Sequence, residues 1–165
     1  MKNIYNKKVD LKKGIELNLF NITYKKLNQS IDEVFINVKF GDPDFDFVHE
    51  LKKNNAVFSV FKTHRQQNDL AKQLINDKGN LKNFNDFKTD TEKIIGKYNT
   101  DWLKTEYNTA VLRARQASNF RKFERDKDIY PNLKWLPSTS VEPRQEHVAF
   151  YNKIWAIDDN FWTES

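Results

Sequence analysis

Bulky apolar residues recur every three or four positions through the first 126 residues, a spacing that predicts amphipathic helices. The clearest stripe covers residues 16–40, which would form a helix roughly 36 Å long, and the turn residues Gly41-Asp42-Pro43-Asp44 are expected to end it. A helix of that length favours a long hairpin or bundle over a compact α/β sheet. The same spacing predicts a short helix over residues 44–54, a longer one after a break at Asn54-Asn55, and two more over residues 83–96 and 99–126.

The helix that follows Asn54-Asn55 is expected to bury one apolar side and to end before Gly79. That side comprises Val57, Val60, Phe61, His64, Ala71, Leu74 and Ile75. Gly79 has the position of a glycine that closes a helix in the left-handed conformation. His64 falls on the apolar side, so it is interpreted as a hydrogen-bonded core residue and not as a ligand.

The pattern changes after residue 126. Pro131 and Pro137 bias the residues before them away from helix, so residues 130–137 are expected to be extended. The pattern then predicts a short helix within residues 141–149, a short strand over residues 151–157 and a loop over residues 158–162. The sequence therefore predicts a predominantly α-helical α+β protein, in which a long helical hairpin or bundle precedes a small β-containing C-terminal unit.

The chain of 165 residues is long enough for one domain with an appendage. We expect a basic tail and helical segment over residues 1–55 and a second domain over residues 56–165. That second domain would divide into a helical half, residues 56–127, and a small β unit, residues 128–165. No apolar run approaches the roughly 20 residues that cross a bilayer, so no membrane contact is expected.

The composition removes several classes of functional site. The chain has no cysteine, which excludes disulfides, a cysteine nucleophile and thiolate metal sites. Its three histidines show no metal-binding spacing, and its four glycines form no phosphate-binding loop. We therefore expect no metal and no cofactor.

Positive charge is concentrated in two places, although 28 Lys and Arg against 23 Asp and Glu leave a net charge of only +5. Lysines gather within residues 1–13, and most of the arginines lie within residues 113–125. Such a group could bind nucleic-acid phosphates, or it could form an ordinary solvated helix face. The candidates for nucleic-acid contact are Arg113, Arg115, Arg121, Lys122 and Arg125.

One group of polar residues has catalytic potential. Arg144, Glu146 and His147 could cleave RNA, with Glu146 or His147 as the general base and Arg144 stabilising the phosphorane charge. The same residues also fit a structural cluster, in which a carboxylate pairs with the histidine and the arginine pairs across a turn. Both interpretations stay open at this point.

Three segments of the last forty residues resemble the phage Mu protein F-like family of head morphogenesis, or minor head, proteins. The segments are Tyr130-Pro131-Asn132-Leu133-Lys134-Trp135, Val141-Glu142-Pro143-Arg144-Gln145-Glu146-His147 and Asp158-Asp159-Asn160-Phe161-Trp162. They match the family's PNL-aromatic strand, its arginine followed three residues later by histidine, and its acidic-x-Phe-Trp loop. Residues 63–87 and 102–110 are also similar to the family's helical half, so the resemblance covers about residues 56–162.

The resemblance implies a structural, non-catalytic protein of the phage head. It implies association with the portal protein and capsid components, and contact with packaged double-stranded DNA, which the arginine cluster suggests would be non-specific. It places the protein in the virion, inside the capsid near the portal, and in the host cytoplasm during assembly. The residues that match the family signature are Trp135, Arg144, His147, Asp159, Phe161 and Trp162.

We expect the signature residues to lock the fold of the small β unit. A pair between Asp159 and an arginine or histidine would orient the loop, and Phe161 and Trp162 would pack the sheet against the helices. Family members usually continue into a segment with two cysteines, so a truncated or divergent member is expected, with the chain ending at Ser165.

Two alternatives to a head protein are retained. One is a nuclease or ADP-ribosyltransferase-type toxin domain that uses Arg144, Glu146 and His147. The other is a host-encoded helical adaptor that has kept the fold and lost the virion.

Overall fold

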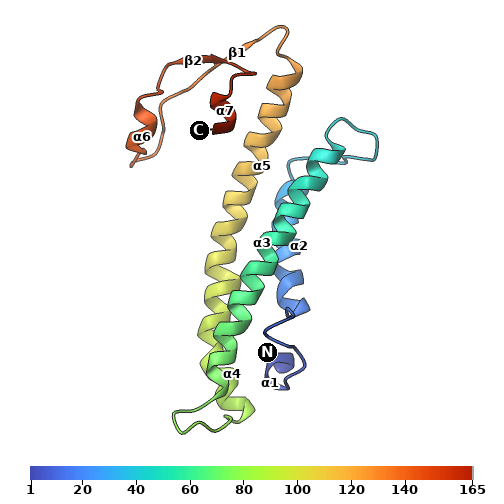
Figure 1. Ribbon diagram of the computed structural model, residues 1–165, viewed down its shortest axis with the longest axis vertical. Helices are drawn as coiled ribbons and strands as arrows, with labels where there is room; N and C mark the ends of the chain where they lie inside the picture. Colours follow the sequence, from blue (N-terminus) through green and yellow to red (C-terminus); the bar gives the residue numbers. More distant parts are fainter. Residues whose placement is uncertain (165) are drawn as a thin grey trace. The chain divides into compact units, whose positions relative to one another are not determined.

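The structure is a computed structural model that describes residues 1–164. It confirms a predominantly helical α+β protein with a small two-stranded sheet (Figure 1). The helices are α1 (Lys2–Tyr5), α2 (Leu17–Asp32), α3 (Phe45–Ala71), the 3-10 helix η1 (Lys72–Leu74), α4 (Phe84–Gly96), the π-helix η2 (Lys97–Trp102), α5 (Leu103–Arg125), α6 (Gln145–Val148) and α7 (Phe161–Glu164). The strands are β1 (Asn132–Lys134) and β2 (Ile154–Ala156).

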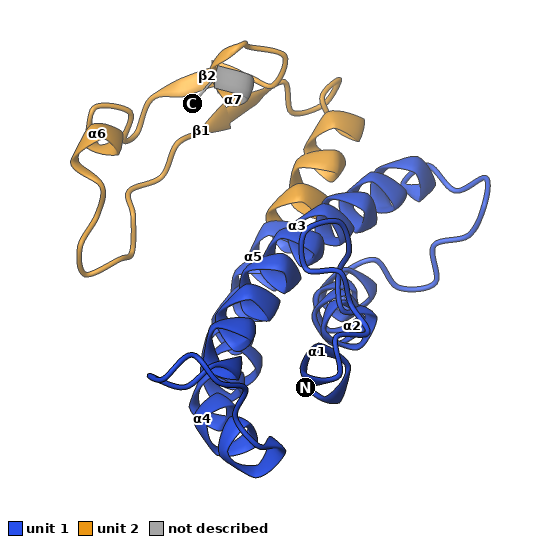
Figure 2. Cartoon of the chain, turned by 60° about the horizontal axis from the view of Figure 1, so that its bottom comes forward, with its two compact units in different colours: residues 1–115 blue, residues 116–165 orange. Residues whose placement is uncertain are grey.

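The chain forms two compact units, which Figure 2 shows in different colours. Unit 1 is Met1–Arg115 and contains α1 to α4 and the first half of α5. Unit 2 is Gln116–Ser165 and contains the end of α5, both strands, α6 and α7. The boundary predicted between residues 55 and 56 falls inside α3. The end of the chain at Ser165 lies outside the described residues.

The break expected at Asn54-Asn55 is wrong, because α3 continues through both residues. The Asn55 side chain donates to Asn28 Oδ1 of α2 at 3.1 Å, so its amide bonds to a neighbouring helix and does not compete for the α3 backbone. Nearby, Lys52 and Asp32 form an ion pair at 2.6 Å. Contacts between α2 and α3 therefore support a continuous helix where the sequence favours a break.

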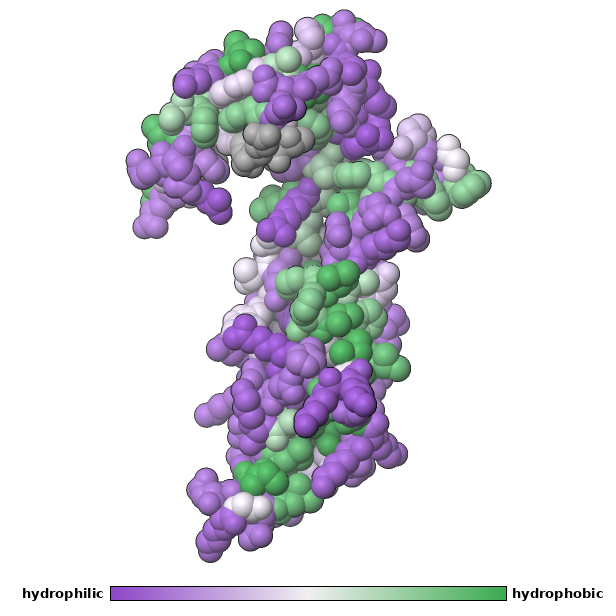
Figure 3. Space-filling model, viewed as in Figure 1, coloured by the Kyte–Doolittle hydropathy of each residue, from purple (hydrophilic) through white to green (hydrophobic). Residues whose placement is uncertain are grey.

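The prediction that this helix buries its apolar side holds at its end, where Ala71 and Leu74 pack on an apolar cluster, but it is wrong for the residues before them. Val57, Val60 and Phe61 are exposed, with 56% and 71% of the surfaces of Val57 and Phe61 open to solvent, and His64 is exposed as well. The side of α3 that faces the protein is polar and comprises Ser59, Lys62, Thr63, Gln66 and Gln67. Figure 3 shows apolar side chains, in green, gathered on the surface of unit 1.

Specific hydrogen bonds satisfy most of the polar residues that α3 buries, whereas the Thr63 hydroxyl and Gln66 Oε1 have no partner within residues 1–164. Gln67 accepts from the Glu16 backbone N–H at 2.9 Å and donates to the Gly14 carbonyl at 2.8 Å, which ties α3 to the segment before α2. Gln66 donates to Asn99 in η2 at 3.2 Å, and Lys62 pairs with Glu106 of α5. A buried polar group that is bonded in this way avoids most of the cost of desolvation.

Two apolar clusters lie on either side of this buried polar layer along α3. The first contains Ile31, Phe35, Val48 and Ala114, and the second contains Ile4, Leu19 and Leu70. Val48 and Leu70 lie near the two ends of α3, so the polar residues separate one cluster from the other. The buried side of α3 is therefore apolar at both ends and polar between them.

Helix α2 ends at Asp32, well before the predicted end at residue 40. The chain turns because Asn37 adopts a left-handed conformation with φ of 58° and the Asp42 carboxylate accepts from the Lys39 N–H at 2.6 Å. Phe35 belongs to the first cluster, and Val34 and Val38 pack against it, so these three residues are partly or fully buried outside the helix. Gly79 is left-handed as expected, with φ of 78°, but it lies in the turn between η1 and α4 and does not close a helix.

The helices predicted over residues 83–96 and 99–126 correspond closely to α4 and α5. Asn83 caps α4 by accepting from the Asp86 N–H at 3.0 Å. No helix within residues 1–164 is both long enough and apolar enough to cross a membrane.

Candidate functional site

Five aromatic residues of unit 2 form one cluster around the two-stranded sheet. Strands β1 and β2 pair antiparallel, with Leu133 opposite Trp155. The Trp155 ring stacks on Phe161 of α7, with ring centroids 4.0 Å apart and planes 1° apart. Phe150 packs edge-on against both rings. We call Trp135, Phe150, Trp155, Phe161 and Trp162 the aromatic cluster.

The last helix, α7, is tied back to the sheet by Trp162. Its indole Nε1–H donates to the Ala156 carbonyl at 2.8 Å, and its ring stacks on Trp135 with centroids 6.0 Å apart. Asp159 Oδ1 accepts from the Phe161 N–H at 2.8 Å, which shapes the turn that leads into α7. The structure thus brings the signature residues Trp135, Asp159, Phe161 and Trp162 together around β2.

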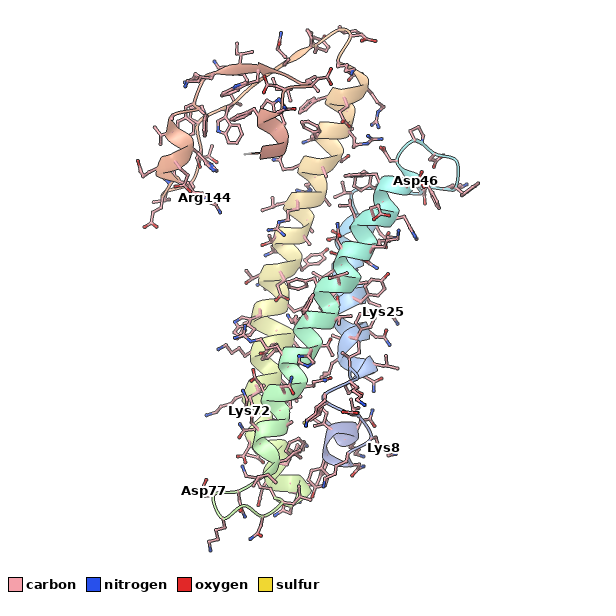
Figure 4. The ribbon with its side chains drawn as sticks, in the orientation of Figure 1. Lys8, Lys25, Asp46, Lys72, Asp77 and Arg144 are labelled. Carbon is pink, nitrogen blue, oxygen red and sulfur yellow. The ribbon has the colours of Figure 1, made fainter. Side chains whose placement is uncertain are left out.

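The signature residues of α6 lie differently. The His147 and Trp135 rings pack edge-to-face with centroids 5.6 Å apart, so this histidine joins the margin of the aromatic cluster. Arg144 precedes the first turn of α6 and is exposed, as Figure 4 shows. The expected pair from Asp159 to an arginine or histidine is wrong: among residues 1–164, Asp159 forms no ion pair with Arg144 or His147. Its carboxylate oxygen instead bonds to the backbone of its own turn.

The three residues of the catalytic alternative share the short helix α6. Arg144 and Glu146 are exposed, and His147 is half-buried against Trp135. A general base needs a reacting proton within hydrogen-bond reach and a site that holds the substrate beside it. The contact that the structure gives His147 is with an indole ring, which suits packing.

The basic residues of α5 do not form a single stripe. Successive helix positions turn by about 100°, so Arg115 and Lys122, seven residues apart, share a side of the helix. Arg113 points about 180° away from Lys122 and lines a groove of unit 1. Arg121 forms an ion pair with Glu124 at 3.0 Å. Arg115, Lys122 and Arg125 are exposed.

The titratable groups with shifted pKa values lie in unit 1. Burial and a hydrogen bond to Asp69 raise the pKa of Tyr98 to about 12, and its hydroxyl donates to Asp69 at 2.7 Å. Hydrogen bonds from Lys72 and Tyr98 lower the pKa of Asp69. Tyr98 belongs to η2 and Asp69 to α3, so the bond braces these two helices. Residues 1–164 contain no cluster of three His, Cys, Asp or Glu that could hold a metal ion.

Two members of the aromatic cluster, Phe150 and Trp155, were not among the predicted site residues. Trp155 lies in the strand expected over residues 151–157, on the face of the strand opposite to that of Ile154 and Ala156. This alternation along the strand is the sequence signal that could have identified Trp155. Phe150 follows α6 in a turn, where no periodicity marks it.

No protein-family model, curated protein or solved structure matches this chain. The similarity to the phage Mu protein F-like family therefore depends on the C-terminal and helical segments described above.

Proposed function

We propose that this chain is a non-catalytic minor head protein of a phage, which associates with the portal protein and contacts packaged DNA. The aromatic cluster is the observation that carries the proposal. Trp135, Phe161 and Trp162, three of the signature residues, contact one another within it. A signature made of packed aromatic rings specifies a rigid module, as an assembly protein requires.

Exposed apolar side chains on unit 2 supply a surface for protein partners. Apolar side chains that a free monomer leaves in water are typical of protein interfaces. Those of unit 2 include Ile129, Leu136, Val141 and Ile154, and Val141 is 99% exposed. We assign this surface to the portal protein or a capsid component.

The contact with DNA is assigned to exposed cations of α5. Arg115 and Lys122 are exposed and share a side of the helix. Lys and Arg side chains release condensed counterions from a duplex, so this contact should be sequence-independent and weaken steeply with salt. In the virion the protein would lie inside the capsid near the portal, after assembly in the host cytoplasm.

Copurification with the portal protein encoded by the same genome tests the assembly role. The full chain should copurify with that portal protein, and a variant with Trp135→Ala and Trp162→Ala should not, because unit 2 loses its packing. A matched control with Arg144→Ala and Glu146→Gln, both on exposed positions of α6, should copurify like the natural chain. Turnover of RNA or NAD that disappears in a folded His147→Ala variant would contradict the proposal and favour the toxin domain.

Filter binding to a DNA duplex at two salt concentrations tests the second contact. Arg115→Glu combined with Lys122→Glu should weaken binding about tenfold or more at low salt. Lys88→Glu combined with Lys93→Glu changes the net charge by the same amount on exposed positions of α4 and serves as the control. Equal affinities for the two double variants would show that net charge alone, and not α5, governs binding.

A further inference from the structure

A groove of about 420 Å³ lies in unit 1 between α2, α3 and α5. Its apolar lining comes from Leu27 and Ile31 of α2, Leu51 and Phe58 of α3, and Ala110 of α5. Small side chains on α5 leave the space open. The volume is within the range of pockets that hold small molecules, roughly 300–1,000 Å³, and such pockets combine an apolar lining with a few polar groups.

Most polar side chains of the groove already have partners within the protein. Ser30 donates to the Leu27 carbonyl at 2.6 Å, and Thr109 donates to the Thr105 carbonyl at 2.9 Å. The Glu106 carboxylate pairs with Lys62. These groups are therefore poor anchors for a ligand, because a ligand would have to displace an existing bond.

Arg113 and Asn54 are the exceptions. Within residues 1–164 neither the Arg113 guanidinium nor the Asn54 amide has a hydrogen-bond or ion-pair partner, and both line the groove. A guanidinium presents five N–H donors in a planar fork that matches a carboxylate. The groove thus has unused donors and calls for an acceptor with negative charge.

These two residues lie at the same end of the groove. Helices α3 and α5 run in opposite directions through unit 1 (Figure 1), and Lys62 and Glu106 fix their register. Asn54 precedes Lys62 by eight residues and Arg113 follows Glu106 by seven, so each lies about 10–12 Å from that pair along its helix. The groove therefore has a donor-rich end at Arg113, an apolar middle, and the Glu106 carboxylate at its other end.

We propose that this groove binds a small amphiphilic carboxylate, such as a medium-chain fatty acid. The carboxylate pairs with Arg113 and Asn54, and the apolar tail lies along Leu27, Ile31 and Phe58. The charge of Arg113 decides between this occupant and a neutral apolar molecule or an apolar helix, neither of which would use it. The proposal does not depend on a role in phage heads, since all of its residues belong to unit 1.

Titration calorimetry with sodium octanoate, and with octan-1-ol as the uncharged ligand, tests the site. The natural chain should bind octanoate with one-to-one stoichiometry and a Kd below about 1 mM, and should bind the alcohol at least tenfold more weakly. Arg113→Gln should weaken octanoate binding about tenfold or more. Arg115→Gln removes the same charge from an exposed position of α5 that does not line the groove, and should leave the Kd unchanged.

A second variant tests the position of the tail. Ala110→Leu fills the middle of the groove and should abolish octanoate binding while circular dichroism shows an unchanged helix content. If that variant does not fold, Arg113→Gln decides alone, since Arg113 is exposed. The proposal is overturned if the natural chain does not bind octanoate, if both arginine variants bind alike, or if octan-1-ol binds as tightly. It is also overturned if the natural chain sediments as a dimer that Ala110→Leu dissociates, because the groove would then be an interface between copies.

Discussion

The ion pair between Lys62 and Glu106 offers a quantitative test of the buried polar layer. The Lys62 side chain is 4% exposed and that of Glu106 is 24% exposed. Glu106→Gln removes the negative charge and leaves the Lys62 ammonium in a site that water barely reaches. Loss of one partner of a buried pair typically costs about 3–5 kcal/mol, and the partial exposure of Glu106 places the expected loss near the lower value.

The reverse variant and the double variant complete the cycle. Lys62→Met leaves Glu106, which still contacts solvent, so we expect a smaller loss of about 1–2 kcal/mol. The double variant leaves no unpaired buried charge, so its free energy of unfolding should lie within about 1 kcal/mol of that of the natural chain. The difference between the double variant and the sum of the single variants is the coupling energy of the pair.

Urea unfolding followed by far-ultraviolet circular dichroism at pH 7 measures all four free energies. The dependence on urea should be similar in every variant, which would show that the compactness of the unfolded state has not changed. A loss below about 0.5 kcal/mol for Glu106→Gln, typical of exposed pairs, would refute the burial of Lys62 and with it the polar layer between the two apolar clusters.

Three further predictions concern other contacts. Burial would raise the pKa of Glu16, but hydrogen bonds from Asn3, Leu19 and Asn18 outweigh it and lower that pKa from 4.5. The Glu16 carboxylate therefore stabilises the fold above pH 4.5, and this contribution is lost as the pH falls through the lowered pKa. The difference in melting temperature between the natural chain and Glu16→Gln should shrink as the pH falls below 4.5. Tyr98→Phe should cost about 1–2 kcal/mol in urea unfolding, and ultraviolet titration of the natural chain should show a tyrosine that ionises at a pH of about 12 and is missing from the variant. Phe161→Ala removes the ring stacked on Trp155, so it should lower the near-ultraviolet circular dichroism intensity and reduce the free energy of unfolding by about 2 kcal/mol. Phe40→Ala changes an exposed ring of unit 1 and should leave that intensity nearly unchanged.

The sequence predicted the helices whose buried side is apolar. Helix α4 was predicted from the spacing of Phe84, Phe87, Ile94 and Ile95, and the structure adds the cap at Asn83. Such a helix is stabilised by burying apolar residues that recur at helical spacing, so its position can be inferred from that spacing without knowledge of its neighbours.

The sequence did not predict the orientation of α3. The apolar side chains of Val57 and Phe61 face solvent, because Gln67 and Lys62 bond to partners on the opposite side of the helix. Those partners, the Glu16 backbone N–H and the Glu106 carboxylate, are distant in sequence. Hydrogen-bond geometry between distant residues leaves no periodic trace, so the spacing favoured the wrong side.

The candidate site was predicted in part. The signature picked out Trp135, Phe161 and Trp162, which do pack together. It also suggested a charged pair for Asp159, whereas a turn of this kind satisfies its carboxylate with the backbone of the next residues. The groove beside Arg113 is formed by three helices and could not be seen in any single segment.

Quantitative mass spectrometry of purified phage particles, produced by the genome that encodes this chain, tests the proposed role most directly. The proposal predicts that the chain is present in each particle in a few copies, in constant ratio to the portal protein, and that particles made with Trp135→Ala and Trp162→Ala lack it. Absence of the natural chain from particles that contain the portal protein would contradict the assignment to the phage head.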